Sequence, residues 1–548
     1  MQGAFAGKYL RVDLTKGTTQ LEEVPELIYR MYLGGSAMAA YFLTREVKPG
    51  IDPLGPENLL VLATCLTTGA PISGSNRYTA AGKSPLSGGY GEAEAGGWWG
   101  PELKLAGFDG IIVTGQSAQP VYLWIHNGQA ELRDASHLWG KISGEVQDTL
   151  KAQTDKRARV LQCGIAGEKL VRFANIVNEL KHFNGRCGLG AVMGSKRLKA
   201  IAIRGQGKLE PKDPQGLAQV TNWFREHYDR DADTLHKFGT SRGVVMFSKD
   251  GILPTRNFRE GQFEHAEVMS GQHMAATILK DEGTCFACAI ACKREVEVPE
   301  LGVTPKYGGP EYETLAAGGM VCGIGDIKAL AKYNQMCGEY VMDTISLGMT
   351  IAFAMECFEK GILTSQDTDG IELRFGNADA LLKMTEKVAK REGFGDILAE
   401  GAARAAERIG RGAEQYALTV KRQEIPMHEP RGKQGVALQY ATAPGGADHM
   451  RAPHDLAYES FHPAGGHALE PLGLSEPVPR LELSPRKVRA YYYAQHWWNL
   501  ANSLGICQLA SVPIDVIPPT LAVNLARALT GWDTSLWELF KVAERGSA

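Results

Sequence analysis

The chain has no uninterrupted apolar run of about 18 residues, so we expect no membrane-spanning helix. Its formal net charge is only −3, which excludes the strongly basic surface of a nucleic-acid-binding protein. The first residues lack a basic stretch followed by an apolar core, so no signal peptide is expected. Ten cysteines without an export signal indicate a reducing compartment, and we therefore expect a cytoplasmic protein without a disulfide framework.

Strand-like segments, rich in β-branched residues and bounded by turns, dominate the first part of the chain. They are Tyr9–Leu14, Leu59–Ala63, Gly110–Thr114, Val121–Ile125 and Ala200–Arg204, with short helices expected at Trp98–Ala106 and Gly144–Ala152. Beyond a polar linker at 205–215 the apolar residues recur with helical spacing. Helices are expected at Leu217–Tyr228, Ile327–Tyr340, Thr350–Lys360, Asp379–Arg391, Gly395–Ile409, Lys487–Ser503 and Pro519–Leu529.

This pattern predicts an α+β protein in three parts. A β-rich domain at 1–208 is followed by two largely helical domains, at 209–418 and 419–548. Glycine is frequent, with 64 residues, so much of the backbone must turn tightly or approach another group closely.

Three cysteines form a C-x2-C-x3-C motif, Cys285, Cys288 and Cys292, and Cys507 is a fourth candidate far along the chain. A tight turn with three thiolates plus one remote thiolate is typical of a [4Fe–4S] cluster. A structural zinc site is the main alternative, although such sites usually show two pairs of closely spaced cysteines, or cysteines with nearby histidines. Plain packing of buried cysteines is the third interpretation.

Two glycine-rich stretches, Ser73–Gly110 and Asn184–Gly205, combine close backbone approach with isolated cations such as Arg77 and Arg186. Backbone N–H groups beside an arginine suit a phosphate. Neither stretch fits a P-loop, and the second precedes a strand, which excludes a dinucleotide fingerprint. Together they favour a large phosphorylated cofactor on the N-terminal sheet.

Several titratable residues lack a basic neighbour in the sequence and are candidates for proton or ligand chemistry. They are Glu311 and Glu313 in GGPEYETLAAGG, and Asp343 in VMDTISLG. His449, which follows GGAD, can change its charge near neutral pH and is a candidate acid or base.

Taken in order, the motifs resemble the aldehyde:ferredoxin oxidoreductase family of tungsten-pterin enzymes over essentially the whole chain. The motifs are GKYLRVDLT, GGWWGPELK, GRCGLGAVMGSKRLKAI, C-x2-C-x3-C, GPEYET, DTISLG, PRG, GADH and NSLGIC. The resemblance implies a bis-pyranopterin cofactor holding tungsten, or molybdenum in the same cage, usually without a side-chain ligand to the metal. The N-terminal sheet would then be the saddle on which the pterins lie.

The resemblance also implies residue roles. Arg77 and the Arg186–Cys187 turn would meet the pterin phosphates and the Mg²⁺ ion that bridges them. Asp343 and Asn502 would open the two pterin-contacting loops, the second of which contains Gly505 and Ile506. The [4Fe–4S] cluster of Cys285, Cys288, Cys292 and Cys507 would lie beside one pterin.

Two positions depart from the family pattern. Asn502 stands where an acid is usual, so its carbonyl would accept from a pterin N–H without charge assistance. Cys187 stands where a small residue is more usual and could crowd the phosphate turn.

The implied reaction is the oxidation of an aldehyde to a carboxylate with water. Glu313 is expected to be the base and His449 the acid that hydrogen-bonds the carbonyl, with Glu311 as the alternative base. Electrons would pass through the cluster to ferredoxin or to an iron–sulfur partner subunit. A tungsten subunit of a multi-subunit reductase, acting on acyl-CoA or carboxylate substrates, is the alternative function, and an electron carrier without its pterin is a third.

Oligomeric state is not readable from the sequence, and a homo-oligomer stays open. Some members of the family bridge subunits with iron bound by an E-x-x-H motif in the middle domain. Here the motif occurs at Glu179–His182 and Glu459–His462, both outside that domain.

Overall fold

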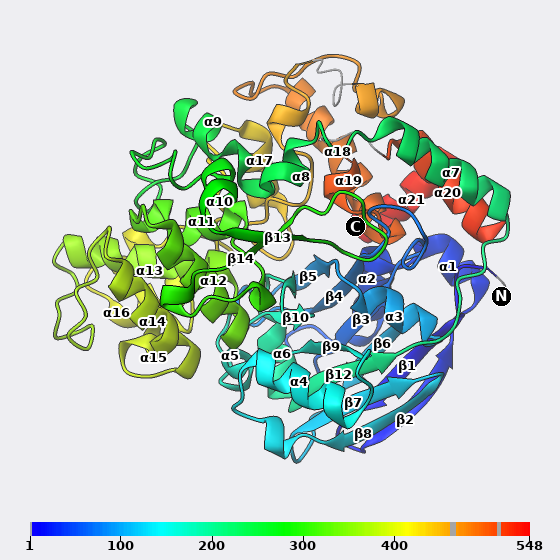
Figure 1. The fold of residues 1–548 in the computed structure, drawn as a ribbon, viewed down its shortest axis with the longest axis horizontal. Helices are drawn as coiled ribbons and strands as arrows, with labels where there is room; N and C mark the ends of the chain where they lie inside the picture. Colours follow the sequence, from blue (N-terminus) through cyan, green and yellow to red (C-terminus); the bar gives the residue numbers. More distant parts are fainter. Residues whose placement is uncertain (1–2, 461–466, 512–516, 548) are drawn as a thin grey trace.

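The computed structural model describes residues 3–460, 467–511 and 517–547. Its N-terminal part contains two six-stranded sheets (Figure 1). The first sheet has the order β2-β1-β6-β3-β4-β5 and is antiparallel except for the parallel pair β1 and β6. Its strands are β1 Lys8–Asp13, β2 Thr18–Glu23, β3 Leu60–Thr64, β4 Tyr78–Lys83, β5 Tyr90–Ala95 and β6 Gly110–Thr114.

The second sheet has the order β11-β10-β9-β12-β7-β8, with β7 and β12 parallel and the other pairs antiparallel. Its strands are β7 Val121–His126, β8 Gln129–Asp134, β9 Arg159–Gln162, β10 Ile176–Asn178, β11 His182–Asn184 and β12 Leu198–Arg204. Helix α4 (Ser143–Gln153) covers one face of this sheet, packing Val146 and Leu150 against Val160 and Ala202.

Strand β3 shows how the first sheet is buried on both faces. Leu60 and Leu62 belong to a core shared with the second sheet and with α3 (Trp99–Leu105). Val61 and Ala63, which point to the opposite face, belong to a core shared with the C-terminal helices. A strand buried on both faces reads as a continuous apolar run, as this one does.

The middle of the chain is mainly helical. Its helices include α7 Pro214–His227, α11 Tyr312–Gly318, α12 Ile327–Tyr340, α13 Thr344–Glu359, α14 Ala378–Lys390, α15 Phe394–Leu398 and α16 Ala402–Ile409. Helix α13 is buried along almost its whole length, so it forms the centre around which the others pack. A small hairpin, β13 (Leu279–Gly283) and β14 (Lys293–Val296), holds the cysteine triplet in its connection.

The last helices return to the start of the chain, as Figure 1 shows. They are α17 Gln434–Thr442, α18 Pro485–Leu504, α19 Gln508–Ser511, α20 Pro519–Thr530 and α21 Leu536–Ser547. Helices α18 and α21 pack against α2 (Gly35–Glu46), which lies on the first sheet. This return places Cys507, just beyond α18, beside elements of the N-terminal sheet.

The α+β class predicted from the sequence is confirmed. The single helix predicted at Gly395–Ile409 is wrong, because the chain forms α15 and α16 with a break at Gly401. Gly401 has a φ of +85°, and a Cβ atom there would lie 2.9 Å from Leu86 and Glu424 side-chain atoms. Helix α13 also begins six residues earlier than predicted, since Asp343 caps its first turn.

Within the described ranges, no single helix has the length and hydropathy of a membrane span. Only the segment from α11 to Cys322, taken together with α12, meets that test, and the two halves are bent by 119° and largely buried in the helical core.

Candidate active site and cofactor site

A carboxylate and two imidazoles converge where the middle and last parts of the chain meet. Glu313 lies in the first turn of α11, and His428 and His449 lie in the loops before and after α17. The Oε1 atom of Glu313 is 3.0 Å from Nε2 of His428 and 3.5 Å from Nε2 of His449. Its other oxygen accepts a hydrogen bond of 3.0 Å from the backbone N–H of Met427, which fixes the carboxylate in place.

The ligand atoms of these three residues lie within 4.8 Å of one another, a spacing that a divalent metal could bridge. A fourth residue decides against that use. Nζ of Lys433 lies 3.0 Å from Nδ1 of His428, so a charged Lys433 donates to Nδ1 and leaves the imidazole proton on Nε2, facing Glu313. We therefore interpret Glu313, His428 and His449 as acid–base residues and not as metal ligands.

The structure separates the two acids of GPEYET, which the sequence could not. Glu311 accepts a hydrogen bond from Thr240 and forms a 2.8 Å ion pair with Lys293. Although burial opposes it, Lys293 holds the pKa of Glu311 below its ordinary value. The expectation that Glu311 lacks a basic partner is thus wrong, and its carboxylate faces Lys293 and Cys292 instead of His449.

The four candidate cluster cysteines are all free, partly exposed and mutually close. Burial raises the pKa of Cys285 to about 12, with Cys288 and Cys507 near enough to add to it. In a tetrahedral zinc site with Zn–S bonds of about 2.3 Å, the sulfurs lie about 3.8 Å apart. Among the described residues, which include all four cysteines, no three sulfurs lie within 4.8 Å of one another. As placed, the four thiols do not have the geometry of a tetrahedral zinc site.

Arg77 links the cysteine site to the first sheet. It directly precedes β4 and is partly buried, and its Nη2 atom donates a 2.9 Å hydrogen bond to Sγ of Cys507. The backbone N–H of Cys507 donates to the carbonyl of Gly74 at 2.8 Å. A Cβ at Gly74, which has a φ of +88°, would lie 2.8 Å from Ala510, so glycine permits this close approach.

Arg186 contacts three segments that are distant from it in the sequence. Its Nε atom lies 3.3 Å from Oδ2 of Asp343, while Nη1 and Nη2 donate to the carbonyls of Ala447 and Glu424 at 2.7 and 2.6 Å. The other oxygen of Asp343 caps α13 through the N–H of Ile345. Arg186 and Asp343, predicted separately from two motifs, are therefore partners.

Cys187 has a φ of +68° and is buried in the core between the two sheets. Cβ atoms built at Gly91 and Gly445 would lie 2.9 and 3.4 Å from its side chain, so small neighbours accommodate the sulfur.

Asn502 does not open a loop, which corrects the expectation from the resemblance and agrees with the helix predicted at Lys487–Ser503. It lies in the last turn of α18, where its Oδ1 atom accepts a 3.1 Å hydrogen bond from Gln508. Gly505, with a φ of +95°, ends the helix, and the N–H groups of Gly505 and Ile506 both donate to the carbonyl of Ala501. This turn delivers Cys507 to the cysteine site.

Comparison with known proteins identifies the family of the chain. A family model described as the aldehyde ferredoxin oxidoreductase N-terminal domain matches residues 9–205, and one described as domains 2 and 3 of the same family matches residues 216–547. The chain belongs to the aldehyde ferredoxin oxidoreductase family. It is thus an oxidoreductase, as the sequence predicted.

The relatives span more than one activity. The tungsten-containing aldehyde ferredoxin oxidoreductase of Pyrococcus abyssi is 39% identical over 99% of this chain and 87% of its own length. The WOR-like subunit of an aliphatic sulfonate oxidoreductase from Pyrococcus furiosus is 32% identical over 81% of this chain and 75% of its own. The active-site complex BamBC of benzoyl coenzyme A reductase is similar in structure, with a TM-score of 0.84, 27% identity, and coverage of 100% and 88%.

A buried charged network, missed in the sequence, joins Arg451 to the first sheet of the aldehyde ferredoxin oxidoreductase fold. Arg451, two residues after the GADH motif, contacts Glu92 of β5 and lies 3.0 Å from Asp448. Tyr90 and Ser36 also donate to Glu92, at 2.8 and 2.6 Å. The only sequence signals were Glu92 within the first glycine-rich stretch and the position of Arg451 beside GADH.

The residues present fit the phosphorylated pterin cofactor of the family. Burial and the neighbouring Glu92 raise the pKa of Glu94 to about 8, although Arg451 and Arg77 act in the opposite direction. Buried Oδ1 of Asn76, Oε1 of Glu313 and Nδ1 of His449 have no aligned hydrogen-bond partner in the described part of the chain. Buried polar groups are normally satisfied, which indicates that a bound molecule completes this site.

Proposed function

We propose that this protein oxidises an aldehyde to a carboxylate with water as the oxygen source. The observation that carries the proposal is the convergence of Glu313 and His449 from separate elements, directly beside Asp448, which pairs with Arg451. The similarity to tungsten-containing aldehyde ferredoxin oxidoreductases over 99% of the chain supports the same reaction.

Glu313 is the base in this proposal. Its Oε2 atom is held by Met427, which leaves Oε1, without an aligned hydrogen bond in the described residues, to take a proton from water. His449 is the hydrogen-bond donor to the aldehyde oxygen. The Nε2 atom of His449 faces Glu313. Its Nδ1 atom has no hydrogen-bond partner in the described residues and is therefore the nitrogen proposed to donate.

A bis-pyranopterin tungsten centre, when bound, would accept the two electrons of the oxidation. The residues proposed to hold it and the Mg²⁺ between its phosphates are Arg77, Arg186, Cys187, Asp343, Asn502, Gly505 and Ile506. Of these, Arg77 is already hydrogen-bonded to Cys507, so one side chain contacts both the cysteine site and the proposed pterin face.

Cys285, Cys288, Cys292 and Cys507 are proposed to hold a [4Fe–4S] cluster for electron exit. Buried thiols with raised pKa values become thiolates when a metal supplies positive charge, and Arg77 and Lys293 add to that charge. The acceptor is proposed to be ferredoxin or an iron–sulfur partner subunit.

The test is aldehyde-dependent reduction of a viologen dye by the anaerobically purified chain without any partner. Turnover with aldehydes, absent when aldehyde is omitted, supports the proposal. Purified protein that contains tungsten or molybdenum and iron but reduces no dye with any of a panel of aliphatic and aromatic aldehydes would contradict it.

The second candidate is a tungsten subunit of a multi-subunit reductase that acts on acyl-CoA. The structural similarity to the BamBC complex over the whole chain favours it specifically. The same preparation separates the two: dye oxidation that depends on an aromatic acyl-CoA, without aldehyde activity, would favour the reductase.

A further inference from the structure

His428 joins Glu313 to a buried lysine. Its Nε2 atom lies 3.0 Å from Oε1 of Glu313, and its Nδ1 atom lies 3.0 Å from Nζ of Lys433. One imidazole therefore contacts a carboxylate through one nitrogen and an amine through the other. A ring placed in this way can take a proton at one nitrogen while it releases one from the other.

Lys433 is an unusual partner for a structural role. Its side chain is completely buried, and its Nζ atom contacts His428 and lies 4.7 Å above the ring of Phe247. A buried ammonium normally pairs with a carboxylate. Burial lowers the pKa of Lys433 to about 8, and burial followed by the Lys433 charge lowers the pKa of His428 well below its ordinary value. Around and above pH 8 a large fraction of the amine is therefore neutral and can accept a proton, whereas an unperturbed lysine stays charged there.

We infer that His428 and Lys433 form a relay that carries away the proton that Glu313 takes during the reaction. The inference rests on the proposed aldehyde oxidation. The O–H bond of protonated Glu313 breaks as an N–H bond forms at Nε2 of His428, and the N–H bond at Nδ1 breaks as a third N–H bond forms at Nζ of Lys433. The products are a carboxylate, a neutral imidazole and an ammonium, and no electrons move in this step.

The observed contacts match the state after transfer, in which Lys433 donates to Nδ1 and Nε2 carries the proton facing Glu313. The contact between Glu313 and His428 is short but not aligned as a hydrogen bond. Such contacts in catalytic sites commonly tighten when the substrate binds.

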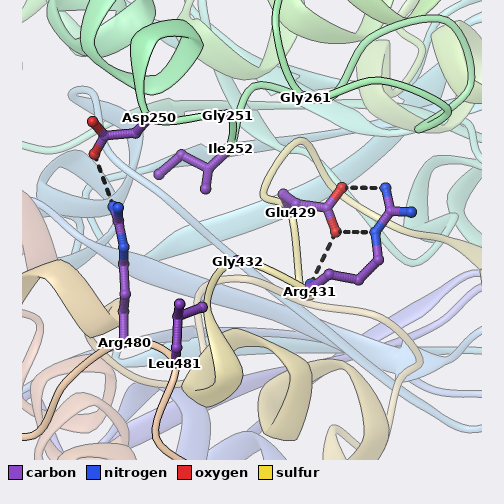
Figure 2. A pocket seen from close by; sticks show the side chains of 9 residues that line it. All are labelled: Asp250, Gly251, Ile252, Gly261, Glu429, Arg431, Gly432, Arg480 and Leu481. Atoms are coloured by element: carbon purple, nitrogen blue, oxygen red, sulfur yellow. Dashed lines mark hydrogen bonds and ion pairs between the residues drawn. The ribbon is translucent and has the colours of Figure 1, made fainter.

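A surface cavity of about 320 Å³, shown in Figure 2, lies near the lysine end of the relay. Gly432, which directly precedes Lys433, lines this cavity together with Glu429 and Arg480. Both Glu429 and Arg480 are close enough to act on the charge of Lys433. Water in the cavity is the proposed acceptor of the proton.

Other charges surround the relay and must be considered in its pH dependence. Three acids, Asp455, Glu313 and Glu429, favour the charged form of Lys433. Arg480 opposes that form. Around His428 the other titratable groups are His449 and His454, whose rings lie 5.2 and 4.1 Å from its own. Because burial keeps His428 and His454 neutral, Lys433 is the group expected to titrate near pH 8.

Lys433→Arg distinguishes a relay from a positioning contact. Arginine keeps the positive charge and a donor toward Nδ1, but it cannot release its proton. A relay predicts that kcat for aldehyde falls at least about tenfold with little change in KM, and that the solvent isotope effect on kcat rises. A positioning contact alone predicts a kcat near that of the wild type.

His428→Gln tests the ring in the same way, since a glutamine amide can hydrogen-bond Glu313 but cannot pass a proton through. Lys306→Arg, in an exposed pair with Asp148, is the matched control and should keep wild-type kcat. Tungsten and iron contents equal to the wild type show that each variant is folded.

Full kcat and an unchanged isotope effect in Lys433→Arg, with an active wild type, would overturn the relay alone. A wild type that turns over no aldehyde would overturn the proposed function and the relay with it. Because the first result requires aldehyde turnover and the second its absence, the two failures are distinguishable.

Discussion

Glu313→Gln changes a single oxygen in the acid–base set. The amide carbonyl can still accept the 3.0 Å hydrogen bond from Met427, so the side chain stays where it is. The amide nitrogen then replaces Oε1, which faces His428 and His449 at 3.0 and 3.5 Å. A nitrogen that already carries two protons cannot accept another, so the base is lost while the packing is kept.

The size of the effect follows from this substitution. A positioned general base contributes a factor of about 10² to 10⁴, which corresponds to about 3 to 5 kcal/mol of transition-state free energy. We therefore expect kcat for aldehyde-dependent viologen reduction to fall by that factor. KM should change little, because Glu313 acts on the water and not on substrate binding.

Glu311→Gln is the matched control, two residues away. Glu311 pairs with Lys293, so this variant should lower kcat by less than about tenfold, without removing a base. Both proteins should hold wild-type tungsten and iron. If Glu313→Gln keeps full kcat, or if Glu311→Gln shows the larger loss, the assignment of the base is wrong.

Three further predictions concern the acid, the cluster and the fold. His449→Asn should lower kcat by at least about tenfold with metals retained, and unchanged kinetics would exclude the proposed donor. Cys288→Ser should lose iron, measured by elemental analysis, and dye reduction; full iron content would contradict the cluster assignment. Lys487→Met should destabilise the protein by about 3–5 kcal/mol in urea unfolding, because it leaves Asp455 charged and buried. Lys328→Met, in an exposed pair, should leave the urea unfolding curve nearly unchanged, and equal losses would refute this reasoning.

The sequence predicted best the elements whose side chains repeat with a clear period. The strand Gly110–Thr114 and the helix Ile327–Tyr340 were predicted with the bounds that the structure has. Helix α2 and strands β4 and β5 were not predicted. Their sequences are rich in alanine and glycine, so their burial against other elements, which only the fold creates, decides their structure.

Most of the candidate site residues are predicted from the order of the motifs along the chain and not from the pattern within one segment. The placement of Glu313 beside His449 depends on the contact between α11 and the loops around α17, which no spacing within one segment encodes. His428 and Lys433 flank the PRG motif, but nothing in that segment shows that His428 faces Glu313 while Lys433 faces His428. Asn502 was placed in a loop because its motif resembles that of the family, whereas α18 extends through it.

The most direct test of the central claim is the elemental analysis of the anaerobically purified wild-type chain for tungsten, molybdenum, iron and zinc. About four irons and one tungsten per chain are predicted, which would support the cysteine cluster and the pterin site together. Molybdenum in place of tungsten would keep the mechanism with another metal. Zinc without iron would contradict the assignment of Cys285, Cys288, Cys292 and Cys507, and with it the proposed route of the electrons.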